Sequence, residues 1–180
     1  MDKKIRLLQV IPRLDVGGAE TGCKDIAQFI ANQNYFSAIL CSGGDQIKNI
    51  DQTKIKIFKF SVHSKNPFMI FFNIFVILFI VLFYKINIIH VRSRAPAWSC
   101  YFASKLLGVS LISTFHGTYN FNNPLKKFYN SVMLRGNSVI AGSRFIFDHI
   151  RNNYNYSKEI FFIPRGINID YFNSKNSNIE

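Results

Sequence analysis

Short apolar runs recur along the chain at intervals that suit buried β-strands. Helical spacing of apolar positions fills most of the intervals between them. The pattern predicts strands at residues 7–11, 36–41, 55–60, 86–91, 111–115, 138–141 and 160–163, and helices at about 19–33, 68–85, 97–107, 125–135 and 144–154. Strands that alternate with helices are typical of a parallel sheet covered on both faces. We therefore expect a Rossmann-like, three-layer α/β domain with a mostly parallel sheet of about seven strands.

One predicted helix is apolar on every side. The segment PFMIFFNIFVILFIVLFY, residues 67–84, carries no charge and a single amide, Asn73. Its length approaches the roughly 20 residues that cross a bilayer. A membrane span would separate the strands at 55–60 and 86–91, so we favour a helix that is buried or lies against the membrane, with insertion as the alternative. Lys85 and the basic surface suit the inner leaflet, which predicts a protein peripheral to the cytoplasmic membrane.

The charge balance narrows the choice of partners. The chain has 22 Lys and Arg against 10 Asp and Glu, a net charge of +12. Such a charge favours anionic partners, namely lipid headgroups, nucleotide phosphates or nucleic acid. The basic residues are scattered and no nucleic-acid-binding motif accompanies them, so we expect no nucleic-acid partner.

The cysteines and the N-terminus indicate an intracellular location. Cys23, Cys41 and Cys100 are odd in number and form no C-x-x-C pair, which favours neither a disulfide framework nor a zinc site. A reducing cytoplasm is their natural compartment. The apolar run before Pro12 is too short for a secretory signal.

Loops at the carboxyl ends of the predicted strands are the candidate ligand sites. They cover residues 15–20, 92–98, 116–123 and 142–145. Gly17 and Gly18 lie between the first strand and the first helix, where glycine can take left-handed angles and admit a phosphate close to the helix N-terminus. A tight turn alone would also explain the pair. The dinucleotide fingerprint G-x-G-x-x-G is absent, because the next glycine is Gly22, and this disfavours a nicotinamide-dependent oxidoreductase.

Four motifs follow one another at these strand ends. They are DVGGAE at 15–20, HVRSRAPAW at 90–98, STFHGTYN at 113–120, and VIAGSRFIFDHI at 139–150 followed by IFFIPRGINIDYF at 160–172. Together they resemble the N-terminal half of a family 4 glycosyltransferase with the GT-B fold, especially the bacterial group that builds lipopolysaccharide or other surface polysaccharides. The resemblance covers residues 1–172 and leaves 173–180 as the start of an interdomain linker.

The resemblance implies roles for individual residues. His116 is expected beside the reacting sugar, where an imidazole can donate a hydrogen bond or share charge with the transition state; a lone histidine after a strand is otherwise more often structural. The expected contacts to the donor phosphates or other substrate groups are Gly17, Gly18, Glu20, Gly117, Ser143 and Arg144. Ser143 is equally explained as a helix N-cap.

The expected acceptor contacts come from the second motif. Arg92, Ser93 and Arg94 end a strand, where guanidinium groups can hold a phosphate or acidic sugar. The alternative is a solvated loop in which these arginines pair with Asp15 and Glu20.

Two departures from the family pattern affect the functional expectation. The common I-P-N-G ending is Ile163-Pro164-Arg165-Gly166 here, and the role of Arg165 is left open. The chain also stops at Glu180, where the family continues into a second Rossmann-like domain that holds the nucleotide. We therefore expect half of a retaining glycosyltransferase, which uses a nucleotide-sugar donor and a glycan or lipid-linked acceptor and does little alone. A separately encoded C-terminal domain is one way to complete it, and a split or decaying gene is the alternative.

No D-x-D pair is present, so no metal is expected, and no cofactor beyond the nucleotide-sugar substrate. The alternative function is a non-catalytic, membrane-associated binding module or the relic of a split gene.

Overall fold

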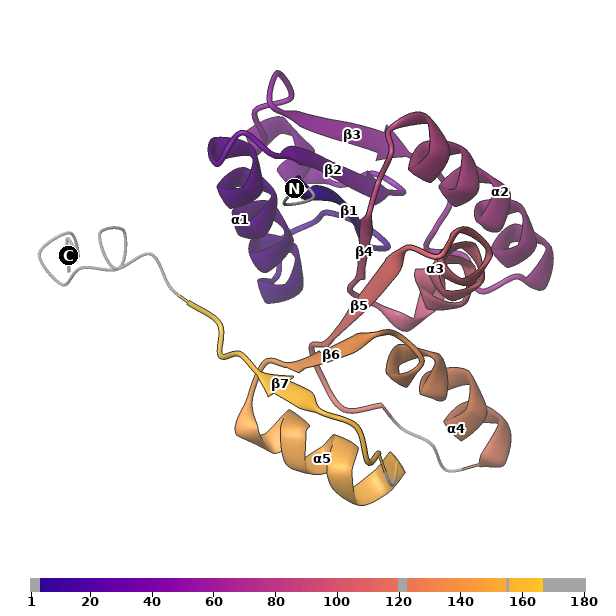
Figure 1. Ribbon diagram of the computed structural model, residues 1–180. Helices are drawn as coiled ribbons and strands as arrows, with labels where there is room; N and C mark the ends of the chain where they lie inside the picture. Colours follow the sequence, from indigo (N-terminus) through magenta and orange to yellow (C-terminus); the bar gives the residue numbers. More distant parts are fainter. Residues whose placement is uncertain (1–3, 120–122, 155, 167–180) are drawn as a thin grey trace, which may run out of the picture.

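A single parallel sheet organises the molecule, as the computed structural model shows (Figure 1). The structure describes residues 4–119, 123–154 and 156–166. The strands lie in the order β3-β2-β1-β4-β5-β6-β7. Their bounds are β1 Arg6–Val10, β2 Phe36–Cys41, β3 Ile55–Lys59, β4 Ile88–Val91, β5 Ser110–Phe115, β6 Ser138–Ala141 and β7 Ile160–Phe162. The predicted seven-stranded Rossmann-like fold is thereby confirmed.

The strand order reverses between β1 and β4. The chain first moves outward from β1 to β3 and then returns to β4 on the other side of β1. In β1, Leu8 is paired with Ala38 of β2 and with Ile89 of β4, and all three are fully buried. The carboxyl ends of all the strands meet at one edge, and the reversal at β1 and β4 marks the point where α/β sheets bind ligands.

Helices cover both faces of the sheet. The helical elements are α1 Gly18–Asn32, η1 Asp45–Asn49, α2 Pro67–Phe83, α3 Arg94–Leu107, α4 Pro124–Ser131, η2 Val132–Leu134 and α5 Arg144–Tyr154. On one face, α1 buries Cys23, Ala27 and Ala31 against the first three strands. On the other face α2 packs on α3, and α3 in turn contacts η2, β4 and β5 (Figure 1). Two separate apolar cores result, one on each face.

Some predicted boundaries were wrong. The helix predicted at 125–135 ends at Ser131, whose hydroxyl donates to the carbonyl of Phe128, and continues as the short 3₁₀ turn η2, which buries Val132 and Met133. The loop predicted at 92–98 is mostly helix, because α3 already begins at Arg94. Pro96 fits there, since the first helical turn needs no backbone donor.

The apolar helix α2 is buried on one side only. Asn66 caps its N-terminus by accepting from the amide of Phe68 at 2.9 Å, and Pro67 starts the first turn. The residues turned inward are Asn73, Ile77, Ile80 and Val81. Among residues 4–119, 123–154 and 156–166, no helix has the length and apolar character needed to cross a membrane. The preference for a non-spanning helix agrees with this finding.

Candidate active site

Two strand ends bring His116 and Arg165 into contact. His116 directly follows β5, and Arg165 lies in the IPRG segment after β7. Nη2 of Arg165 donates to Nδ1 of His116 at 2.8 Å. Because Nδ1 accepts, the ring hydrogen belongs on Nε2. Nε2 is buried without a hydrogen-bond partner in the described part of the chain.

Gly18 makes room for the Arg165 guanidinium. A Cβ at Gly18 would lie 2.0 Å from Nη1 of Arg165, and one at Gly142 would lie 3.9 Å from its Nε. The guanidinium thus lies over the first residue of α1, where free backbone N–H groups favour anions. Arg165 forms no ion pair with any described carboxylate. A cation without an acidic partner therefore stands at the place where the sequence predicts donor phosphates.

The glycine pair does not use the left-handed angles that glycine allows. Positive φ occurs at Gly43, Gly44 and Gly108, whereas Gly17 has an extended φ of 170°. What the pair requires is space: a Cβ at Gly17 would lie 2.4 Å from the carboxylate of Glu20. Glu20 folds back over the start of α1, and a side chain at either glycine would displace a charged group.

Burial keeps the histidines of this edge neutral. Burial, together with the nearby cations Arg92 and Arg165, lowers the pKa of His116 to about 3. His90, on β4, is also buried, and its Nε2 lies 2.7 Å from the hydroxyl of Thr114. Desolvation holds the pKa of His90 well below its usual range. At neutral pH both rings act as uncharged hydrogen-bonding groups.

Arg92 was expected at an exposed strand end, but the residue is buried. Only 5% of the residue is exposed. Its Nε donates to Oε1 of Gln9 at 2.8 Å and its Nη2 to the carbonyl of Gly22 at 3.2 Å. Gln9 in turn donates to the carbonyl of Cys23. Arg92 therefore links β4 to β1 and α1, and the alternative of a solvated loop is wrong for this residue.

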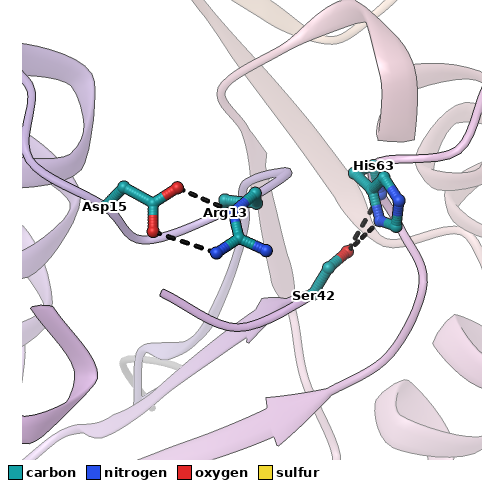
Figure 2. Close-up of polar contacts among 4 residues, drawn as sticks. All are labelled: Arg13, Asp15, Ser42 and His63. Carbon is teal, nitrogen blue, oxygen red and sulfur yellow. Dashed lines mark hydrogen bonds and ion pairs between the residues drawn. The ribbon is translucent and has the colours of Figure 1, made fainter. Parts of the chain in front are cut away.

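Asp15, one of the two acidic residues predicted as partners of these arginines, has another partner. Asp15 pairs with Arg13, with Nε to Oδ2 at 2.7 Å and Nη2 to Oδ1 at 3.2 Å (Figure 2). This exposed contact lowers the pKa of Asp15. Nδ1 of His63 lies 2.7 Å from the hydroxyl of Ser42. This contact, drawn in Figure 2, ties the segment after β3 to the end of β2.

Arg94 borders a basic pocket. Its Nη1 donates to Oδ1 of Asn130 at 2.8 Å, and its guanidinium lies 4.1 Å from the centre of the Tyr119 ring. The pocket has a volume of about 440 Å³ and is lined by Lys65, Arg94, Asn123, Leu125, Lys126, Tyr129 and Asn130. Three cations and no carboxylate line it, so it favours an anion.

Of the other predicted site residues, Ser93, Ser143 and Arg144 lie at helix starts and Gly117 lies in the loop after β5. Ser93 precedes α3 without a capping hydrogen bond from its side chain. The hydroxyl of Ser143 accepts from the amide of Ile146 at 3.2 Å, as an N-cap does. Arg144 is largely exposed and pairs with Asp148 along α5. A Cβ at Gly117 would meet open space. The structure thus leaves the substrate roles of these residues as predictions.

Possible metal ligands do not cluster among the described side chains. No group of three or more His, Cys, Asp or Glu side chains capable of holding an ion occurs within the described ranges. The expected absence of a metal and of a cofactor stays a prediction.

Sequence reasoning missed two functional or supporting residues. Arg165 was left without a role, although its place in IPRG, after the last strand, already put it at the ligand edge. Gln9 was passed over inside an apolar strand, where a buried amide needs partners. The signal for Gln9 was a polar residue inside an apolar strand, and the signal for Arg165 was a cation where the common family ending has Asn.

The strand reversal and the cationic edge define a Rossmann-like half of a GT-B fold. The family model for Glycosyltransferase Family 4 matches residues 16–171. A glycosyltransferase from Rickettsia africae is 38% identical, with a TM-score of 0.83, over 98% of this chain and 47% of its own. The chain therefore belongs to glycosyltransferase family 4.

More distant solved structures share the fold. The lipopolysaccharide outer core galactosyltransferase WaaB is 13% identical, with a TM-score of 0.64, over 92% of this chain and 47% of its own. The Acinetobacter baumannii MurG structure is 15% identical, with a TM-score of 0.60, over 77% of this chain and 41% of its own. No curated protein matches. The chain spans about half the length of these three solved structures.

Proposed function

We propose that this chain is the acceptor-side half of a retaining glycosyltransferase that moves a sugar from a nucleotide donor to a lipopolysaccharide or other surface-glycan precursor. The observation that carries the proposal is the convergence of Arg165, His116 and Gly18 at the ligand edge of a family 4 domain. The likeness to WaaB supports a surface-glycan acceptor only as an analogy of fold.

Arg165 is the residue best placed to meet the donor diphosphate. Its guanidinium combines a fixed positive charge with the N-terminus of α1, and phosphate groups bind well to both. Nδ1 of His116 accepts a hydrogen bond from Nη2 of Arg165 and so orients the guanidinium group. Negative charge that develops on the leaving diphosphate would be stabilised at this position. No metal and no cofactor enter this scheme.

We assign binding of the acceptor to Arg94 rather than to Arg92. Arg92 is buried and its hydrogen bonds are directed to Gln9 and Gly22. Arg94 borders the basic pocket with Lys65 and Lys126. A phosphate or acidic sugar of the acceptor fits this lining. If the chain binds to the cytoplasmic surface of the inner membrane, a precursor held in that membrane can reach the pocket.

Full activity needs the half of the enzyme that this chain does not span. The solved relatives are about twice as long, and we propose that the remaining half, separately encoded or continuous with this one, holds the nucleotide. Purified alone, the chain should transfer less than about a thousandth of what an intact relative transfers, because charge on the leaving group lacks most of its stabilising contacts. The assay incubates it with nucleotide sugars and bacterial membranes. Transfer at a rate comparable to the intact Rickettsia africae enzyme would contradict the need for a second half.

A second candidate is a non-catalytic module that binds membranes. The apolar side chains that α2 leaves exposed favour it. The two candidates differ in their response to an added nucleotide-binding half. A binding module keeps its membrane affinity and gains no transfer activity, whereas a glycosyltransferase half gains transfer activity. The joint assay of both halves therefore separates them.

A further inference from the structure

The outer surface of α2 is far more apolar than a free surface should be. Seven large side chains of this helix are 53–84% exposed, namely Phe68, Phe71, Phe72, Phe75, Phe79, Leu82 and Phe83. Some of these rings pack on each other along the helix: the ring centroids are 5.1 Å apart in the Phe71–Phe75 pair and 5.6 Å apart in the Phe79–Phe83 pair. They recur every three or four residues and so form one continuous stripe.

The stripe continues onto the two neighbouring helices. Phe102 and Leu106 of α3 are 42% and 69% exposed, and Leu125 and Phe128 of α4 are 79% and 58% exposed. Figure 1 shows α2, α3 and α4 on the same side of the sheet. We call these eleven side chains of α2, α3 and α4 the apolar face. Exposed patches of this kind mark interaction sites.

Positive charge lies around the apolar face. Lys65 precedes α2, Lys85 follows it, and Lys105 lies in the last turn of α3. Lys126 and Lys127 lie on α4. No described Asp or Glu belongs to α2, α3 or α4. Apolar side chains within a basic border complement the interface of an anionic bilayer, in which rings enter the acyl boundary and lysines meet the phosphates.

The basic pocket opens at one end of this face. Lys65 and Lys126 line both the pocket and the border, and Leu125 belongs to the pocket and to the apolar face. The pocket lies at the N-terminal ends of α2, α3 and α4, the ends at which helix dipoles favour anions. These are also the helix ends nearest the carboxyl edge of the sheet, where His116 stands.

We propose that the apolar face lies flat on an anionic bilayer and that the basic pocket takes the phosphate monoester of a lipid held in that bilayer. Acyl chains stay in the membrane beside α2 and α4, while the phosphorylated headgroup reaches Lys65, Arg94 and Lys126 and is directed toward the active edge. This deepens the acceptor assignment, on which the link to catalysis rests. The binding itself stands on the surface alone.

Vesicle sedimentation of the 180-residue chain tests the apolar face. We expect pelleting with vesicles of phosphatidylcholine and phosphatidylglycerol, and little with phosphatidylcholine alone. Replacing Phe75 and Phe79 by Ser should lower the partition coefficient at least tenfold, since both rings are solvent-exposed and the fold does not need them. The matched control is Phe29→Ser, a 63% exposed ring on α1, across the sheet, which should leave the partition unchanged. Equal losses in both variants, or no pelleting of the unaltered chain, would overturn the proposal.

A second comparison tests the pocket. Vesicles with phosphatidic acid, a phosphomonoester, should bind more tightly than vesicles of equal surface charge made with phosphatidylglycerol. Lys65→Gln and Lys126→Gln should each remove about fivefold in affinity for phosphatidic acid, the equivalent of about 1 kcal/mol for a lysine near an anionic surface. Lys48→Gln, on η1, is the control and should have no effect.

Inorganic phosphate separates a lipid headgroup from a free anion. Release of the chain from phosphatidic acid vesicles by millimolar phosphate would show a free-phosphate site and contradict the proposal. Continued pelleting supports it. None of these readouts depends on sugar transfer, so a failed transfer assay leaves the surface assignment intact, and a failed pelleting assay leaves the glycosyltransferase proposal intact.

Discussion

Nη2 of Arg165 lies 2.8 Å from Nδ1 of His116, although the two residues are 49 positions apart in the chain. The contact exists because β5 and β7 are parallel strands separated only by β6, so their carboxyl ends approach one another. It gives His116 a defined tautomer and leaves the guanidinium as the charged group at this edge. The neutral ring and the permanent cation form one unit.

Displacing Arg165 should change the state of His116. Gly18→Ala places a methyl group 2.0 Å from the present position of Nη1, so the guanidinium must move. We expect Nδ1 of His116 to lose its donor and the ring to sample both tautomers, as Arg165→Gln should also show. Two-bond nitrogen–proton correlation spectra of the imidazole report this directly. Gly22→Ala is the control, because its Cβ meets Arg92 only at 3.6 Å. An unchanged spectrum in both Gly18→Ala and Arg165→Gln would refute the contact.

The buried histidines should make the fold sensitive to mild acid. His116, with a pKa of about 3, and His90, with a pKa well below 6.5, stay neutral in the folded chain, whereas the unfolded chain protonates them near 6.5. The stability is therefore fully present above pH 6.5 and is lost as pH falls below it. We expect the free energy of unfolding in urea to fall by about 1–2 kcal/mol for each histidine between pH 7 and pH 5.

His90→Gln supplies the comparison for this pH effect. The variant should show a smaller loss between the two pH values, because one of the two buried rings is gone. The carboxyl groups with lowered pKa, Asp15 and Asp51, are still ionised at pH 5 and do not contribute. Equal stability of the unaltered chain at both pH values would contradict buried neutral histidines.

Arg92 and Gln9 should behave as a coupled pair in unfolding. Arg92→Met leaves Oε1 of Gln9 buried without its donor, which costs about 1–3 kcal/mol. Burial already lowers the pKa of Arg92, since its charge has no described ion-pair partner. The double variant Gln9→Leu with Arg92→Met should therefore lose less than the sum of the single variants. Urea unfolding of all four proteins measures the coupling, and strict additivity would show that the two side chains are independent.

Patterning predicted the fold because buried parallel strands and helical spacing leave direct marks in the sequence. The run at 36–41 and the strand β2 Phe36–Cys41 coincide, and the helix at 144–154 has the bounds of α5. Four of the five predicted α-helices start within one residue of the observed helix. The exception is α3, which begins at Arg94 rather than at 97, because Pro96 fits the first turn of a helix.

The site was harder to predict, because side-chain direction depends on tertiary contacts. Arg92 and Arg94 are two residues apart, yet one turns inward to Gln9 and the other borders a pocket. Nothing local to HVRSRAPAW distinguishes them. Arg165, the partner of His116, follows β7, and β6 lies between that strand and β5. Only the order of strands in the sheet reveals that the two residues meet. The sequence marks the apolar helix clearly, but which of its residues are exposed depends on how α2 packs on α3.

The most direct test of the central claim is sugar transfer by a hybrid enzyme. In it, this chain replaces the matching half of the Rickettsia africae glycosyltransferase, to which it is 38% identical. We predict that the hybrid transfers sugar from a nucleotide donor to a membrane acceptor, and that His116→Ala in the hybrid lowers the rate at least about a hundredfold, as removal of a single transition-state contact does. A folded hybrid that transfers sugar equally well with and without His116 would contradict the assigned active site. A folded hybrid with no transfer, beside an active parent enzyme, would contradict the glycosyltransferase function of this chain.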